Sequence, residues 1–121
     1  MDTVQLAIAN ASYASALREL LVRNGAFKVL CVDRPDLDRE GVLVVDSERL
    51  KLLPMPLREP QRIVLIARND PASLSKAWEA GVSSVVFEVD PLNTAVLAIM
   101  SARLQLPIGK RGRAAGNDLV A

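Results

Sequence analysis

Five short apolar runs recur along this chain of 121 residues, and segments with helical character separate them. A strand with one face in water alternates apolar and polar residues, whereas these runs are almost continuously apolar. Strands of that kind are buried on both faces, as in a parallel sheet that helices cover on either side. We expect strands at Val4–Ala9, Phe27–Val32, Gly41–Val45, Ile63–Ala67 and Ser84–Phe87.

The segments between the runs carry helix start and stop signals. Gly25 is suited to be the left-handed residue after a helix, because glycine adopts that conformation without a steric penalty. Ser47 can cap a short helix. The Asp-Pro pairs at Asp70 and Asp90 each combine an N-cap acceptor with proline at the first helical position. We expect helices over Ser12–Asn24 and Glu48–Leu53, from Asp70-Pro71 to Gly81, and from Asp90-Pro91 to about Leu104.

This alternation predicts an α/β fold of the flavodoxin-like type, a three-layer sandwich with a five-stranded parallel sheet of order 2-1-3-4-5. One connection departs from the pattern. Only the seven residues Arg34–Glu40 separate Asp33 from Gly41, and they reach at most about 25 Å when extended. Either the second helix is shortened or missing, or the second and third strands form a long-looped antiparallel hairpin.

The composition excludes several classes of chemistry. The chain has no histidine, which removes His-based triads, His metal sites and phosphohistidine chemistry. Fifteen basic and fourteen acidic residues leave a net charge of +1, so the charge balance indicates neither a nucleic-acid nor a membrane surface. The single cysteine, Cys31, lies in an apolar run, and we expect a small buried thiol in a reducing compartment. Without a membrane-span length of apolar residues or a recognisable signal peptide, we expect a cytoplasmic protein.

Residues 3–104 resemble the receiver domains of two-component response regulators. Gly41–Asp46 looks like the third strand of that family with its terminal aspartate, and Ile63–Arg68 looks like the fourth strand. Ala77–Val82 resembles the end of the fourth helix, and Val85–Val89 resembles the fifth strand. The resemblance favours a shortened second helix over the hairpin.

The positions that support phosphoryl transfer in that family are replaced here. Ala9 and Asn10 stand where the family has an acidic pair. Ile66 stands where a hydroxyl is expected, and Glu88 replaces a lysine. A phosphoryl group brings together several negative charges that a divalent cation and a lysine must offset, and Glu88 adds repulsion instead. The resemblance makes Asp46 the phosphoacceptor candidate, with Mg²⁺ as cofactor only if it is phosphorylated, but we interpret Asp46 as capping the following helix.

Other candidate sites have less support. Asp46, Asp33 and Glu88 can gather at the carboxyl edge of the sheet, where open α/β folds bind ligands. No ligand spacing supports a metal site there, and such edge acids are usually solvated or cap helices. No glycine-rich phosphate loop follows any strand. The basic segment Gly109–Arg113 is interpreted as a solvated linker and not as a nucleic-acid contact.

The last two helices predict an association face. Val96, Ile99 and Met100 share one side of the last helix, and its alanines widen the apolar surface beyond an ordinary core stripe. Trp78 belongs to an apolar stripe of the preceding helix, which is either core or part of the same face. In receiver domains the fourth and fifth helices and the strand between them form the usual dimer surface. The resemblance therefore implies a homodimer or a protein partner there, unless the last helix packs only on the sheet.

The sequence thus supports three hypotheses. The first is a degenerate receiver (pseudo-receiver), non-enzymatic, that signals through protein contacts at residues 1–104, with 105–121 as a tail or linker to an output domain. The second is a receiver phosphorylated at Asp46 by a histidine kinase. The third is a small-ligand sensor at the carboxyl edge of the sheet.

Overall fold

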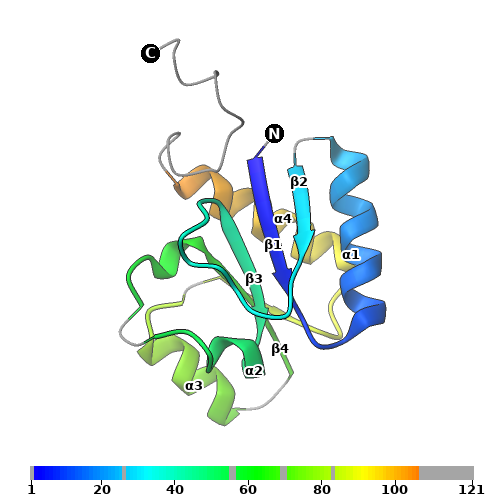
Figure 1. Cartoon of the computed structure of the whole chain (residues 1–121). Coiled ribbons are helices and arrows are strands. Elements are labelled where there is room, and N and C mark those ends of the chain that lie inside the picture. The colour runs from blue at the N-terminus through cyan, green and yellow to red at the C-terminus, as the bar shows by residue number, and fades with distance from the viewer. Residues whose placement is uncertain (1, 26, 55–56, 69–70, 83, 107–121) are drawn as a thin grey trace.

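The computed structural model describes residues 2–25, 27–54, 57–68, 71–82 and 84–106, without the side chain of Ser73. Strands and helices alternate along the chain, except between β2 and β3 (Figure 1). In chain order the elements are β1 (Asp2–Ala7), α1 (Ala11–Asn24), β2 (Phe27–Cys31), β3 (Val42–Asp46), α2 (Ser47–Leu50), the 3₁₀ helix η1 (Pro60–Arg62), β4 (Ile63–Ala67), α3 (Pro71–Glu79), β5 (Ser84–Phe87) and α4 (Leu92–Gln105).

The five strands form one parallel sheet in the order β2-β1-β3-β4-β5. This confirms the predicted strand order and direction. β1 pairs in parallel with both β2 and β3, so the two strands run the same way with β1 between them. The antiparallel hairpin that the short connection left open is therefore wrong.

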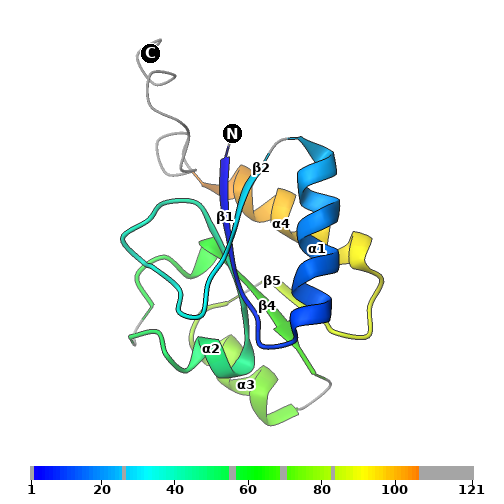
Figure 2. The same ribbon diagram turned by 45° about the vertical axis from the view of Figure 1, so that its right-hand side comes forward.

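Alternate residues of each central strand face opposite sides of the sheet, and each side has its own apolar cluster. Figures 1 and 2 show α1 and α4 beside one face, and α2 and α3 beside the other. The first cluster joins β1, β3, β4 and β5 to α1 and α4, and includes Leu6, Val44, Val64, Leu17 and Ile99. The second joins the strands to α2 and α3, and includes Leu43, Leu65, Leu50 and Ala77.

A loop takes the place of a helix between β2 and β3. The side chain of Gln5, on the central strand β1, is 1% exposed and reaches this loop. Its amide nitrogen donates to the carbonyl of Asp36 at 2.9 Å, and its amide oxygen accepts from the Asp36 N–H at 2.9 Å. The amide nitrogen and the amide oxygen thus both bond to one loop residue, which fixes the loop against the sheet.

Arg62 holds the other end of the same loop. The residue is 5% exposed, and its guanidinium donates to three loop carbonyls. Nε lies 2.8 Å from the carbonyl oxygen of Gly41, one terminal nitrogen lies 3.2 Å from that of Leu37, and the other bonds that of Arg39. Gly41 has φ of 110°, a conformation that glycine adopts readily, so the chain can turn there into β3.

Several predicted element ends need correction. β1 begins at Asp2, whose buried carboxylate pairs with Arg103 of α4, and it ends at Ala7, before the predicted Ala9. α2 covers Ser47–Leu50, with Asp46 as its N-cap in place of Ser47. The predicted N-cap at Asp70 lies outside the described residues.

The start and end of α4 also differ from prediction. The helix starts at Leu92, with Pro91 at N-cap, because the Asp90 carboxylate instead accepts from the Phe87 N–H at 3.0 Å. α4 continues to Gln105, and Leu106 is buried in the first cluster. The last helix therefore ends one residue beyond the predicted Leu104, and residues 107–121 of the expected tail lie outside the described part.

Two further expectations concern Cys31 and Gly25. Cys31 is exposed and not buried, because β2 is at the end of the sheet and no helix follows it. Gly25 behaves as predicted, with φ of 77° and its N–H bonded to the carbonyl of Val22. In the described ranges, no helix combines the length and apolar character that crossing a membrane requires.

Candidate functional site

A cleft of about 260 Å³ lies at the carboxyl end of the central strands. Its lining brings together all five residues that the receiver resemblance singled out: Ala9, Asn10, Asp46, Ile66 and Glu88. They come from the ends of β1, β3 and β4 and from the residue after β5, which a parallel sheet places at one edge. The five positions therefore lie together at the carboxyl edge of the sheet.

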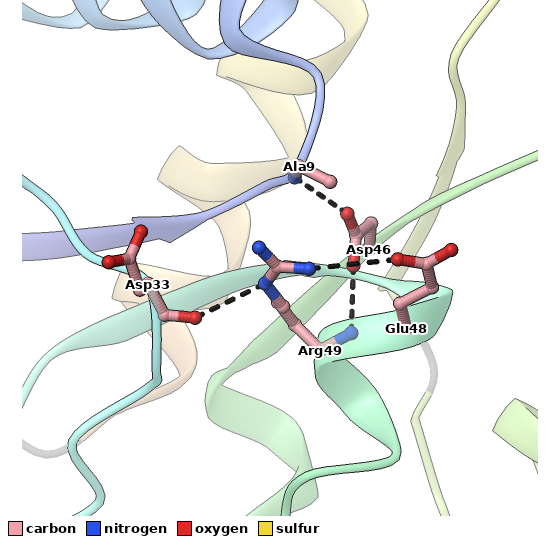
Figure 3. A network of polar contacts seen from close by, with 5 residues as sticks. All are labelled: Ala9, Asp33, Asp46, Glu48 and Arg49. Carbon is pink, nitrogen blue, oxygen red and sulfur yellow. Dashed lines mark hydrogen bonds and ion pairs between the residues drawn. The ribbon is translucent and has the colours of Figure 1, made fainter.

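Asp46 is held by two backbone N–H groups. One carboxylate oxygen accepts from the N–H of Arg49 at 2.8 Å and caps α2. The other accepts from the N–H of Ala9 at 2.8 Å, which ties the end of β3 to the end of β1 (Figure 3). The interpretation of Asp46 as a helix-capping residue is confirmed, and its bond to Ala9 was not foreseen.

The side chain of Arg49 lies at the same edge of the sheet, between Asp33 and Glu48. Its Nε donates to the carbonyl of Asp33 at 3.1 Å, and a terminal nitrogen lies 3.6 Å from a Glu48 carboxylate oxygen (Figure 3). Asp33 thus contributes its backbone carbonyl here, and its side chain does not line the cleft. Within the described ranges, no three or more His, Cys, Asp or Glu residues are grouped so as to hold a metal.

Asn10 and Glu88 bond directly across the cleft. The Asn10 oxygen accepts from the N–H of Tyr13 at 3.1 Å and caps α1, while its amide nitrogen donates to Glu88 at 2.9 Å. The second oxygen of Glu88 lies 3.6 Å from Nε of Arg68. Asn10 supplies a donor where an acid would repel Glu88, so the two replaced positions complement each other.

Ile66 forms the apolar part of the cleft. Its side chain is 4% exposed and belongs to the first core cluster. A branched aliphatic side chain at this position contributes packing and offers no hydroxyl to a bound anion.

Six lining residues were not predicted as part of the site: Ile8, Tyr13, Ser47, Glu48, Lys51 and Arg68. Lys51 and Arg68 place two cations in a lining that also contains the carboxylates of Asp46, Glu48 and Glu88. Arg68 directly follows β4, so its position at the edge of the sheet could have been predicted from the sequence. Lys51 directly follows α2, so its position in the cleft depends on the direction of that short helix.

Tyr13 is another lining residue that was not predicted. Its hydroxyl is buried and has no hydrogen-bond partner among the described residues. Burial raises the pKa of the Tyr13 phenol, and the carboxylates of Glu88 and Asp90 raise it further. Tyr13 therefore lines the cleft while its hydroxyl is buried, neutral and without a partner among the described residues.

The predicted association residues do not share one surface. Ile99 is fully buried in the first cluster, so it is a core residue. Val96 and Met100 are partly buried and pack against that cluster. Trp78, in contrast, is 56% exposed on α3, and Leu97 is 66% exposed on α4.

The sequence matches no protein-family model and no curated protein sequence.

Proposed function

We propose that this chain is a non-enzymatic signal-transduction module, a degenerate receiver with a flavodoxin-like three-layer fold that works through protein contacts in the cytoplasm. The parallel sheet of order β2-β1-β3-β4-β5 supports the fold type. The observation that carries the functional proposal is the state of Asp46, whose two oxygens each accept from a backbone N–H.

Phosphoryl transfer to Asp46 would oppose these contacts. A carboxylate oxygen that becomes the bridging oxygen of an acyl phosphate loses its negative charge and so most of its strength as an acceptor from Ala9 or Arg49. The incoming phosphoryl group would meet Glu88, and the charges of Lys51 and Arg68 are partly offset by the acids beside them. The cleft therefore offers little net positive charge to stabilise a phosphoryl group during its transfer.

Without phosphorylation, this module would transmit a signal through contacts with other proteins. Large apolar side chains are exposed on two helices, Trp78 on α3 and both Leu97 and Leu104 on α4. Exposed large apolar side chains of this kind favour a protein partner such as a kinase, an output domain or a second copy.

Incubation with acetyl phosphate and Mg²⁺, followed by intact-mass measurement, tests the proposal. We expect no added phosphoryl mass in the wild type, and none in Asp46→Asn. The matched gain-of-function variant combines Asn10→Asp, Ile66→Thr and Glu88→Lys, which restores the family's residue types at three of the four replaced positions around Asp46 and leaves Ala9 unchanged. Phosphorylation of the wild type that Asp46→Asn abolishes would instead establish the phosphorylated-receiver alternative.

A small-ligand sensor is the second candidate, favoured by one observation. The cleft joins two cations, Lys51 and Arg68, to the unpartnered hydroxyl of Tyr13. Anionic metabolites or nucleotides that bind there would raise the melting temperature, and Arg68→Gln would reduce that rise. Absence of a shift across such a panel would remove this candidate.

A further inference from the structure

The end strand β2 has an open outer edge. In a strand, successive residues direct their backbone groups to opposite sides. The N–H of Val32 bonds the carbonyl of Leu6 on β1, so the even-numbered residues of β2 face β1. Phe27, Val29 and Cys31 therefore direct their N–H and C=O groups outward, and within the described residues no strand pairs with them.

At the opposite end of the sheet, one outward group of β5 already has a side-chain partner. On β5, the N–H of Glu88 bonds the carbonyl of Ala67, so Val85 and Phe87 face outward. The Asp90 carboxylate already accepts from the outward N–H of Phe87 at 3.0 Å. Proteins commonly protect sheet edges in such ways, and an unprotected edge strand is a template for pairing with another strand.

The outward groups of β2 are self-complementary. They occur at three alternate residues that are symmetric about Val29. If a second β2 approaches antiparallel about a two-fold axis, Val29 lies opposite Val29 of the second copy, and Phe27 lies opposite Cys31. All three pairs are of the type that exchanges two backbone hydrogen bonds, so no outward group of β2 is left without a partner.

The surroundings of β2 are also suited to a second copy. A groove of about 840 Å³ runs beside the strand between α1 and the β2–β3 loop. Its walls carry equal numbers of each charge, Arg18 and Arg39 against Asp33 and Asp36, which a two-fold axis can set opposite one another. On the α1 side the wall presents Ala11 and Ser15, whose small side chains permit close approach of two helices.

We propose that β2 pairs antiparallel with β2 of a second copy of this chain, centred on Val29, to make a continuous ten-stranded sheet. This interface lies at β2 and leaves the exposed apolar side chains of α3 and α4 (Trp78, Leu97 and Leu104) free for a different partner. It extends the proposed function and does not depend on the state of Asp46.

Sedimentation of the full chain over a range of concentrations gives the first test. Val29→Pro removes the outward N–H without touching a bond to β1, and proline is tolerated at such edge positions. We expect a dimer in the wild type and a dissociation constant raised about tenfold or more in Val29→Pro. Val85→Pro is the matched control at the outward edge of β5, and it should remain dimeric. A monomeric wild type, or a dimer lost in Val85→Pro and kept in Val29→Pro, overturns the proposal.

Oxidative cross-linking tests the register and does not depend on how well the proline variant folds. Antiparallel residues in a hydrogen-bonded pair have Cα atoms about 5.5 Å apart, within the range that a disulfide spans. Val29→Cys in a Cys31→Ser background should form a covalent dimer, because only residue 29 lies opposite itself. Leu30→Cys in the same background, and the wild type with Cys31, should cross-link far less. Equal cross-linking at all three positions would indicate random collision and refute the register.

Discussion

The side chain of Gln5 and the backbone of Asp36 hydrogen-bond to each other in both directions, each at 2.9 Å. The pair lets a loop lie where this type of fold usually has a helix, because the loop backbone finds its partner inside the sheet layer. A Gln5→Ala substitution leaves both backbone groups of Asp36 without that partner. We expect a loss of about 1–3 kcal/mol in the free energy of unfolding, measured by urea denaturation.

Gln61→Ala is the control for this substitution, since Gln61 is exposed on η1. It should change stability by less than about 0.5 kcal/mol. Equal effects of the two substitutions would show that the Gln5 amide does not anchor the loop.

Arg62 anchors the same loop through charge-assisted bonds to three carbonyls. Burial lowers the pKa of Arg62, and the nearby carboxylates of Glu59, Glu40 and Asp36 act in the opposite direction. Lysine keeps the charge but lacks the planar fork, so Arg62→Lys should cost about 1–3 kcal/mol. Arg58→Lys, at an exposed position, is the matched control in the same denaturation experiment. If Arg62→Lys left the stability unchanged, the planar geometry of the guanidinium would be unimportant for holding the loop.

The contacts of Gln5 and Arg62 with the loop could not be predicted from the sequence, whereas other features could. The strands Ile63–Ala67 and Ser84–Phe87 were predicted to the residue, because continuous apolar runs between turn signals reflect burial on both faces. The cleft was located because parallel strands end at one edge. Gln5 and Arg62 carry no periodic signal, and their partners are backbone groups far along the chain, so only the folded structure reveals them.

The same limit applies to helix ends and to Cys31. A capping residue is chosen by competition between nearby acceptors, and Asp90 serves the Phe87 N–H instead of the following helix. Cys31 belongs to an apolar run, but its exposure depends on the position of β2 at the end of the sheet. The predicted strand order already placed β2 at the end of the sheet, so the expectation that Cys31 is buried rested on the apolar run alone.

Asp46 should behave as a structural residue in stability measurements. Asp46→Ala removes the acceptor for both Arg49 and Ala9, and we expect a loss of about 1–2 kcal/mol. Asp46→Asn retains one acceptor oxygen for the helix cap, so its cost should be smaller. Glu48→Ala is the control, because Glu48 is exposed and only pairs with Arg49 at 3.6 Å. A stabilising Asp46→Ala would show instead that Asp46 is strained for a functional purpose.

Asn10 and Glu88 should be energetically coupled. Asn10→Asp keeps an N-cap acceptor for α1 but sets a carboxylate against Glu88, where the amide nitrogen now donates at 2.9 Å. We expect a cost of about 0.5–1 kcal/mol at neutral pH and low salt. Glu88→Lys should reverse that cost in the double variant, giving a favourable coupling in a double-mutant cycle. Additive effects of the two substitutions would exclude a direct interaction.

Tyr13 provides a pH test, because it is the single tyrosine of the chain and its phenolate absorbance is therefore unambiguous. Burial raises the pKa of Tyr13, with Glu88 and Asp90 adding to the effect. The folded phenol should thus ionise at higher pH than the same group in urea, where its pKa is about 10. Below that value both states hold the proton and the full contribution to stability is present. As the pH rises from there through the folded pKa, the unfolded chain releases the proton first, so this contribution is lost.

Two variants separate the causes of the shift. Glu88→Gln removes one nearby charge and should lower the folded pKa of Tyr13 toward its ordinary value, whereas Glu48→Gln should leave it where it is in the wild type. Tyr13→Phe should remove both the absorbance change and this part of the alkaline loss of stability. If the folded and urea-unfolded chains ionised at the same pH, the hydroxyl would have to be solvated, and the unpartnered group beside Glu88 would no longer be a feature of the cleft.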